Sequence, residues 1–139
     1  MALQRTLCII KPDAFKKGVA GSILQMILDA GFSVKGMKLV HLSETQAGRF
    51  YEVHKERPFY KDLVSFMSSG PVIPIALEKE NAIIGWRTLI GATDPAEAEE
   101  GTIRKKFAAS KGENAVHGSD SEENGKIEVG FFFAESELV

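Results

Sequence analysis

One polar loop carries the residue best suited to covalent chemistry. His117 follows Asn114-Ala115-Val116 and precedes Gly118-Ser119-Asp120-Ser121, and Glu128 comes shortly afterwards. A neutral imidazole is a good nucleophile near pH 7, because its pKa is about 6.5 and it needs no strong base to attack phosphorus. The ring must be held with one nitrogen free, and a carboxylate such as Glu128 could hold it. The loop suits a histidine that accepts a phosphoryl group, although an exposed histidine in a surface loop fits the same pattern.

A transferring phosphoryl group carries negative charge, so its site needs cations and hydrogen-bond donors. Arg87 falls within the apolar stripe of a predicted helix, where it is either a side chain that reaches out to solvent or a cation that faces an anion. Three cations at 104–106 follow Thr102 at another predicted helix start, and they oppose the helix dipole unless a phosphate binds there. A solvated basic surface explains this run equally well. The candidate cations are Lys11, Arg87 and Arg104, and the candidate donors are Thr93 and Asn114.

The elements that must position these residues follow from apolar periodicity and turn residues. The predicted strands are Thr6–Ile10, Phe32–Leu42, Val72–Leu77 and the almost wholly apolar run Ile127–Ala134. The predicted helices are Gly21–Gly31, one that starts at the capping box Ser43–Gln46, Tyr60–Ser69, Asn81–Ile90 and a short one from Thr102 to Phe107. Residues 110–126 are predicted to be largely irregular. The order of elements predicts an α+β, ferredoxin-like βαββαβ sandwich, with a four-stranded antiparallel sheet covered by helices on one side.

The second of these helices carries an inward stripe of its own. Its predicted members are Ala47, Phe50, Tyr51 and His54. A tyrosine and a histidine on the inward face of a helix are usually core residues with one satisfied polar atom.

Composition narrows the class of protein. The chain has 139 residues, 44% hydrophobic and 26% charged, which fits one domain spanning 1–139. The net charge of −2 argues against binding nucleic acid through a global field. The single cysteine, Cys8, lies in an apolar run and suits a reducing compartment, and the longest apolar runs are too short to span a bilayer, so we expect a cytoplasmic protein. The sequence contains neither a phosphate-binding P-loop motif nor Gly-x-Gly.

Several segments in register resemble the nucleoside diphosphate kinase family. The histidine loop Asn114–Ser121 resembles its active-site segment, and Thr6–Ala14 resembles its first strand. The other matching segments are His54–Tyr60, Met67–Val72, Gly91–Pro95 and Gly101–Arg104. The resemblance spans essentially the whole chain, and no catalytic position departs from it. Lys111 stands where some members carry an apolar residue near the base.

The resemblance implies a role for each candidate residue. His117 would take the phosphoryl group on Nδ1, and the implied supports of its ring are Glu128, Ser119 and Tyr51. The implied nucleotide-binding residues are Lys11, His54, Phe59, Arg87, Thr93, Arg104 and Asn114, with Phe59 stacked on the base. Mg²⁺ would bridge the phosphates, near Asp120 through water.

The resemblance also implies an activity and an assembly. The implied enzyme moves the terminal phosphoryl group of a nucleoside triphosphate, chiefly ATP, to a nucleoside diphosphate by a ping-pong cycle, which maintains nucleotide pools. The implied assembly is a homotetramer or homohexamer, without a requirement for nucleic acid or membrane.

Three rival hypotheses make different use of the same residues. A phosphohistidine carrier would receive its phosphate from another protein and would need no nucleotide pocket, against which Phe59, Lys11 and Asn114 argue. An RNA-binding module would place basic residues beside the aromatic run Phe131–Phe133, and none stands there. A catalytically inactive structural subunit would not need His117.

Overall fold

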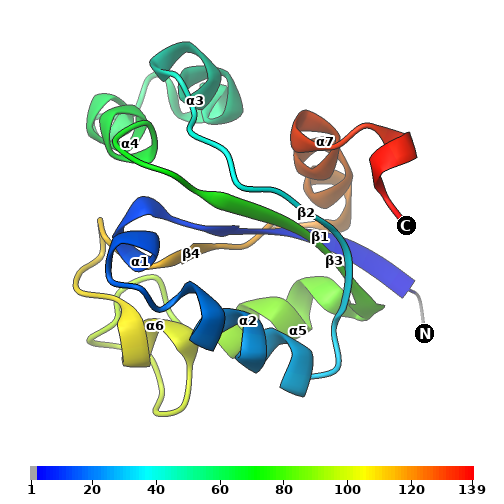
Figure 1. Cartoon of the computed structure of the whole chain (residues 1–139). Coiled ribbons are helices and arrows are strands. Elements are labelled where there is room, and N and C mark those ends of the chain that lie inside the picture. Colours follow the sequence, from blue (N-terminus) through cyan, green and yellow to red (C-terminus); the bar gives the residue numbers. More distant parts are fainter. Residues whose placement is uncertain (1–2) are drawn as a thin grey trace.

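The computed structural model describes residues 3–139, so residues 1 and 2 of the predicted domain lie outside the described residues. Its centre is a four-stranded sheet in the order β2-β3-β1-β4, in which every neighbouring pair is antiparallel (Figure 1). The predicted ferredoxin-like α+β sandwich is therefore confirmed. The strands are β1 (Leu3–Ile10), β2 (Ser33–Met37), β3 (Ile73–Glu80) and β4 (Val116–His117).

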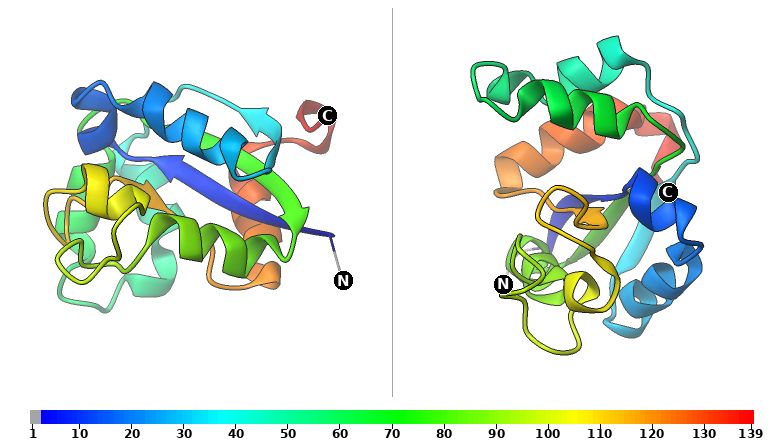
Figure 2. Two further views of the ribbon diagram at one scale, coloured as in Figure 1. Left: turned by 90° about the horizontal axis from the view of Figure 1, so that it is seen from below. Right: turned by 90° about the vertical axis from the view of Figure 1, so that its left-hand side faces the viewer.

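Helices cover both faces of the sheet, so the prediction of a one-sided cover is wrong. Helices α2 and α5 lie on one face, and α3, α4 and α7 lie on the other (Figures 1 and 2). The α-helices are α1 (Pro12–Lys16), α2 (Ala20–Asp29), α3 (Glu44–Phe50), α4 (Tyr60–Met67), α5 (Ala82–Ile90), α6 (Ile103–Phe107) and α7 (Glu122–Phe132). The 3₁₀ helices are η1 (Glu52–His54) and η2 (Glu135–Glu137).

The alternation of side chains along β1 explains the two-sided cover. Cys8 and Ile10 point into a core with α2 and α5, whereas Leu7 and Ile9 point into a second core with α3, α4 and α7. All four side chains are buried, so this half of the strand has an unbroken apolar sequence. Cys8 is completely buried, and burial raises the pKa of its thiol, which makes it an unreactive core residue as expected.

The predicted last strand, Ile127–Ala134, is wrong, because most of it belongs to α7. This helix begins earlier, where the Ser121 side chain accepts a hydrogen bond from the Asn124 backbone N–H, so the end of the predicted irregular segment 110–126 is also helical. Val129 and Phe132 face the sheet at helical spacing, whereas Ile127 is 64% exposed. Exposed apolar residues between the buried ones hid the helical period. The fourth strand is the two-residue β4 instead.

The structure confirms one prediction about the helix that begins at Ser43 and corrects another. The capping box is confirmed: the Ser43 side chain accepts from the Gln46 N–H, and the Gln46 side chain accepts from the Ser43 N–H. Helix α3 ends at Phe50, however, and His54 lies in η1. Arg87 lies in α5 and its side chain is exposed, which is compatible with both predicted alternatives, a side chain that reaches solvent and a cation that faces an anion. Within residues 3–139, no helix has both the length and the apolar character that a membrane span requires.

Candidate active site

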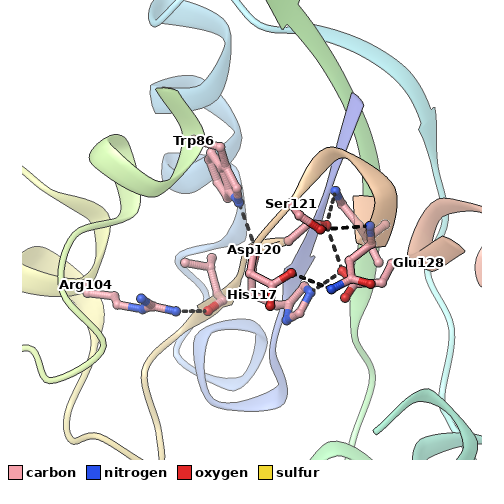
Figure 3. Close-up of polar contacts among 10 residues, drawn as sticks. Trp86, Arg104, His117, Asp120, Ser121 and Glu128 are labelled. Carbon is pink, nitrogen blue, oxygen red and sulfur yellow. Dashed lines mark hydrogen bonds and ion pairs between the residues drawn. The ribbon is translucent and has the colours of Figure 1, made fainter. Parts of the chain in front are cut away.

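The His117 ring is held by a carboxylate from the C-terminal helix. His117 Nε2 lies 2.7 Å from Glu128 Oε1, and the two side chains are only 16% and 22% exposed (Figure 3). The Ser119 hydroxyl donates to the same oxygen over 2.7 Å and accepts from the Leu7 backbone N–H over 3.1 Å. Strand β4, strand β1 and helix α7 are therefore joined at this point. The expected neighbours Glu128 and Ser119 do meet the ring.

The protonation of the ring follows from these bonds. An ionised carboxylate only accepts hydrogen bonds, so the Nε2 that faces Glu128 must carry a hydrogen. Burial lowers the pKa of His117, and Lys11 and Arg104 lower it further, although Glu128 acts in the opposite direction. The imidazole is therefore neutral at pH 7. With Nε2 protonated, its Nδ1 holds a free lone pair, which is the requirement for attack on phosphorus.

Aromatic side chains enclose the ring. Phe50 meets it edge-on with ring centroids 5.5 Å apart, and Tyr51 does so at 6.4 Å. Burial raises the pKa of the Tyr51 phenol, and Glu128 adds to that effect, so the phenol stays neutral. Its hydroxyl is buried and has no hydrogen-bond partner in the part of the chain that the structure describes. Tyr51 thus lies beside the ring as expected, and it contributes apolar surface and one uncommitted hydroxyl.

Trp86 fixes the backbone of His117 through a hydrogen bond that the sequence did not reveal. The completely buried Trp86 donates from Nε1 to the His117 carbonyl over 3.0 Å (Figure 3). Gly118 makes this approach possible, because a Cβ there would lie 2.9 Å from Trp86 Cδ1. Trp86 is one of the buried residues of α5, and nothing in the sequence identified its polar partner.

Lys11 lies at the end of β1, beside the histidine segment. Its side chain is buried, and Nζ donates to Asn114 Oδ1 over 2.9 Å. Burial, and secondly the nearby Arg104, lower the pKa of Lys11 to about 8, while Asp13 opposes this shift. Lys11 therefore remains mostly a cation at pH 7 and is poised to lose its proton in mildly alkaline solution.

Arg104 is tied to the backbone on three sides. It donates from Nε to the Asn114 carbonyl, from Nη1 to the Gly91 carbonyl and from Nη2 to the Val116 carbonyl, over 3.3, 3.0 and 2.9 Å. Burial and the charge of Arg87 lower the pKa of Arg104 to about 10, so it is still a cation at pH 7. A guanidinium has five N–H donors, so two remain for an anion. The basic run after Thr102 thus contributes one buried residue, while Lys105 and Lys106 stay exposed.

Two hollows adjoin these cations. One, of about 730 Å³, has the apolar side chains of Phe59 and Leu63 on its lining together with Lys11 and Asn114. The other, of about 500 Å³, is lined among others by Arg87, Thr93 and Arg104, and Thr93 also lines the first. The first hollow offers an apolar surface beside the Lys11 amine and the Asn114 amide. The second brings two arginines together with Glu97 and Glu99.

Most of the predicted nucleotide-binding residues thus surround two adjoining hollows. His54 is the exception, because it lines neither hollow. Its ring packs against that of Phe59, with ring centroids 5.5 Å apart.

Asp120 is the candidate ligand for a metal ion. Among residues 3–139 no cluster of three or more histidine, cysteine or acidic side chains could hold one. Asp120 is exposed and accepts a hydrogen bond from Asn124 Nδ2 over 2.6 Å, which, with a smaller contribution from Arg87, lowers the pKa of Asp120. Mg²⁺ needs only one or two protein carboxylates when water and the phosphates of a substrate complete its coordination, so a single ionised carboxylate such as Asp120 can serve.

Comparison with known proteins identifies the family. Residues 4–138 match the family model described as nucleoside diphosphate kinase. The chain belongs to the nucleoside diphosphate kinase family. It is 61% identical over 137 residues to the nucleoside diphosphate kinase of Chloroherpeton thalassium, which covers 99% of this chain and 97% of that protein. It is 56% identical to that of Salinibacter ruber, covering 100% of this chain and 98% of the relative.

Solved structures agree with this assignment. The nucleoside diphosphate kinase of Aquifex aeolicus superposes with a TM-score of 0.98 at 47% identity, covering 99% of this chain and 100% of that one. The Halobacterium salinarum nucleoside diphosphate kinase, solved in complex with CDP, superposes with a TM-score of 0.94 at 36% identity, covering 99% and 92%. The family that the sequence motifs resembled is therefore confirmed across nearly the whole chain.

Proposed function

We propose that this chain is a nucleoside diphosphate kinase that carries the terminal phosphoryl group of a nucleoside triphosphate, chiefly ATP, to a nucleoside diphosphate through a phosphorylated His117. Membership of the family supports the reaction class. The observation that best supports His117 as the phosphorylated residue is the 2.7 Å contact between its Nε2 and Glu128, which leaves Nδ1 with a free lone pair.

In the first half-reaction, Nδ1 of His117 attacks the γ-phosphorus of the triphosphate. A P–N bond forms as the bond to the bridging oxygen breaks, and the nucleoside diphosphate leaves with the bonding electrons. The ring gains positive charge in this step, and the Glu128 carboxylate at Nε2 stabilises it. Ser119 keeps that carboxylate in place through its own 2.7 Å bond. Tyr51 and its neighbours exclude water from one side of the ring.

The second half-reaction reverses the first with a different nucleotide. A β-phosphate oxygen of the acceptor diphosphate attacks the phosphorus on His117, the P–N bond breaks, and the neutral imidazole is restored. Because the first product leaves before the second substrate binds, one pocket serves both nucleotides, which is a ping-pong cycle.

The nucleotide would lie across the two hollows. Phe59 would stack on the base, which tolerates any base because each has an apolar face. Lys11 and Asn114, joined by their 2.9 Å bond, would meet the sugar and its nearest phosphate. The residues proposed to hold the phosphates are Arg87, Thr93 and Arg104, with His54 supporting Phe59.

Members of the family require a divalent cation, and we propose Mg²⁺ for this chain. When bound to the phosphates, it would offset their charge. The side chain proposed to face it through water is that of Asp120, which its bond from Asn124 keeps ionised.

We also propose the setting of the enzyme. Residues 1–139 would form one nucleoside diphosphate kinase domain, assembled as a homotetramer or homohexamer in the cytoplasm, where it would maintain the pools of nucleoside and deoxynucleoside triphosphates. Size-exclusion chromatography with light scattering would distinguish the two assemblies.

A phosphoenzyme assay tests the proposal. Purified protein with Mg²⁺ and γ-labelled ATP should gain label that is labile in acid and stable in alkali, and GDP should remove it as GTP. His117→Ala should gain none. His41→Ala is the matched control, because that histidine is exposed and bonds the Ser68 carbonyl. Label on His117→Ala, or full exchange by it, would refute the mechanism, and label only from another phosphoprotein would favour the carrier hypothesis.

A further inference from the structure

Ala115 adopts a backbone conformation that its side chain disfavours. Its φ is 71°, in the left-handed region, and it is completely buried between Asn114 and Val116. A residue with a Cβ pays about 1–2 kcal/mol for this conformation, so its neighbours must hold it there. The two residues on either side belong to the histidine segment, and any relaxation of Ala115 would turn them.

Both polar groups of the Ala115 backbone are held by residues at the end of β1. Its carbonyl accepts from the Lys11 backbone N–H over 2.8 Å, and its N–H donates to Asp13 Oδ2 over 3.0 Å. The first bond continues the pairing of β1 with β4. The second depends on a side chain, and so on the identity of residue 13.

Asp13 is buried more deeply than a helix-capping acid needs to be. Its residue is 7% exposed in the first turn of α1, and its other oxygen, Oδ1, is buried without a hydrogen-bond partner among residues 3–139. A buried carboxylate with one idle oxygen is costly for folding. The Asp13 oxygen that has a partner, Oδ2, contacts the strained Ala115 peptide.

The bond also complements Arg104. That side chain holds the carbonyls of Asn114 and Val116, which flank Ala115, while Asp13 holds the amide between them. Arg104 and Asp13 thus hold the two sides of the peptide that joins Asn114 to Ala115, and Arg104 also holds the peptide that follows Val116. In this arrangement the Asn114 side chain faces Lys11 and the His117 ring faces Glu128.

We propose that Asp13 is a positioning residue for the phosphoryl transfer, which locks Ala115 in the left-handed conformation and so sets His117 and Asn114 together. This inference rests on the proposed role of His117. Asp13 acts through the Ala115 amide. Its charge also raises the pKa of Lys11, and Asp13→Asn and Asp13→Leu both remove that charge, so the difference between these two variants reports the hydrogen bond.

The test compares side chains that do and do not accept the Ala115 hydrogen bond. Asp13→Asn keeps an acceptor oxygen, Asp13→Ala removes it, and Asp13→Leu fills similar space without one, so that a cavity cannot explain its effect. Asp29→Ala, an exposed acid on α2, is the matched control. The readouts are the single-turnover rate of phosphoenzyme formation at saturating Mg-ATP, the nucleotide Kd and the thermal unfolding midpoint.

We expect Asp13→Leu and Asp13→Ala to phosphorylate His117 about 10- to 100-fold more slowly while they remain folded at the assay temperature. Asp13→Asn should stay within about threefold of the parent, because the conservative variant restores the bond. Adding Ala115→Gly to Asp13→Leu should recover about five- to tenfold, because glycine adopts a positive φ without the penalty.

Equal rates for Asp13→Leu, Asp13→Asn and the parent would overturn the proposal. So would a loss in Asp13→Leu that Ala115→Gly leaves unchanged and that matches the fraction unfolded, since Asp13 would then serve stability alone. Amide NMR separates this inference from the proposed function. The Ala115 and His117 amide signals should move in Asp13→Leu and stay in Asp13→Asn, and unchanged signals would reject the lock even if the parent formed no phosphoenzyme.

Discussion

Replacing Glu128 tests whether the carboxylate behind the ring drives phosphoryl transfer. Glu128→Ala removes the acceptor for both the His117 Nε2–H and the Ser119 hydroxyl. Hydrogen bonds to a charged group contribute about 1.5–3 kcal/mol. The partners are 16% and 22% exposed, so solvent screening weakens this bond little. If the bond strengthens fully as the ring becomes charged, its loss lowers the rate of phosphoenzyme formation about 10- to 150-fold.

The structure also predicts which kinetic constant changes. Glu128 lines neither hollow, so nucleotide Kd should stay within about twofold while kcat falls. Glu128→Gln keeps an acceptor and should lose less. Glu128→Gln also removes a charge that raises the pKa of His117. The fall of its phosphorylation rate in acid (the acid limb) should therefore move to lower pH. Quench-flow measurement of the phosphoenzyme with ATP, over pH 5 to 9, provides both quantities.

The control for this prediction is Glu123→Ala, an exposed acid on the same helix. Glu128→Ala also leaves the buried Ser119 hydroxyl without its acceptor, which costs about 1–3 kcal/mol of stability, so rates must be measured well below the unfolding midpoint. A folded Glu128→Ala protein that is phosphorylated within twofold of the parent rate would refute the argument. An unchanged acid limb in Glu128→Gln would refute its electrostatic part.

Three further predictions concern pH, packing and the base. Because the folded pKa of His117 lies below its ordinary value and that of Lys11 is about 8, kcat/KM should fall on the acid side at a lower pH than a free imidazole would give, and again above about pH 8. The unfolded chain binds more protons than the folded one just below pH 6.5, so His117 should also make stability decline as pH falls there, and a monotonic pH–rate profile would contradict the assignment. Gly118→Ala brings a methyl group within 2.9 Å of the buried indole and should lower stability by about 1–3 kcal/mol in urea unfolding, unlike Gly21→Ala, which has open space. Phe59→Ala should weaken nucleotide binding by about 1–3 kcal/mol in calorimetry with little change in stability, since this side chain is 47% exposed, and an unchanged Kd would exclude stacking.

Local sequence rules predicted the elements whose cause is local. The capping box at Ser43 and the apolar run that forms the second half of β1 each depend on a few adjacent residues, and both are as expected. Helix α7 was missed because apolar residues lie on its exposed face as well as on its buried face, which hides the helical spacing of the buried ones. Phe131 and Ile127 are exposed, and they made the segment look apolar on every side. Only the position of this helix over β1 reveals which apolar positions are buried.

The site followed the same division. Matching motifs selected the candidate residues, and the structure gathers three of them, Lys11, Arg104 and Glu128, around His117. The contacts of Arg104 with three backbone carbonyls, and of Trp86 with the His117 carbonyl, could not be predicted. They join segments distant in the sequence, and backbone acceptors carry no residue type that a motif can display.

The contacts of Arg104 resolve a tension in the proposed mechanism. A residue meant to bind phosphate already has three of its five donors on carbonyls, from the loop at Gly91 and from both sides of Ala115. A flexible cation would have to lose conformational freedom when the nucleotide arrives, whereas this guanidinium is already fixed by the fold, with two donors to spare. The carbonyls that fix it also accept its hydrogen bonds in place of the water that burial removes. Burial and the charge of Arg87 lower the pKa of Arg104, and its three carbonyl contacts fix its position. Both observations support the proposal that the phosphate site is built before the substrate binds.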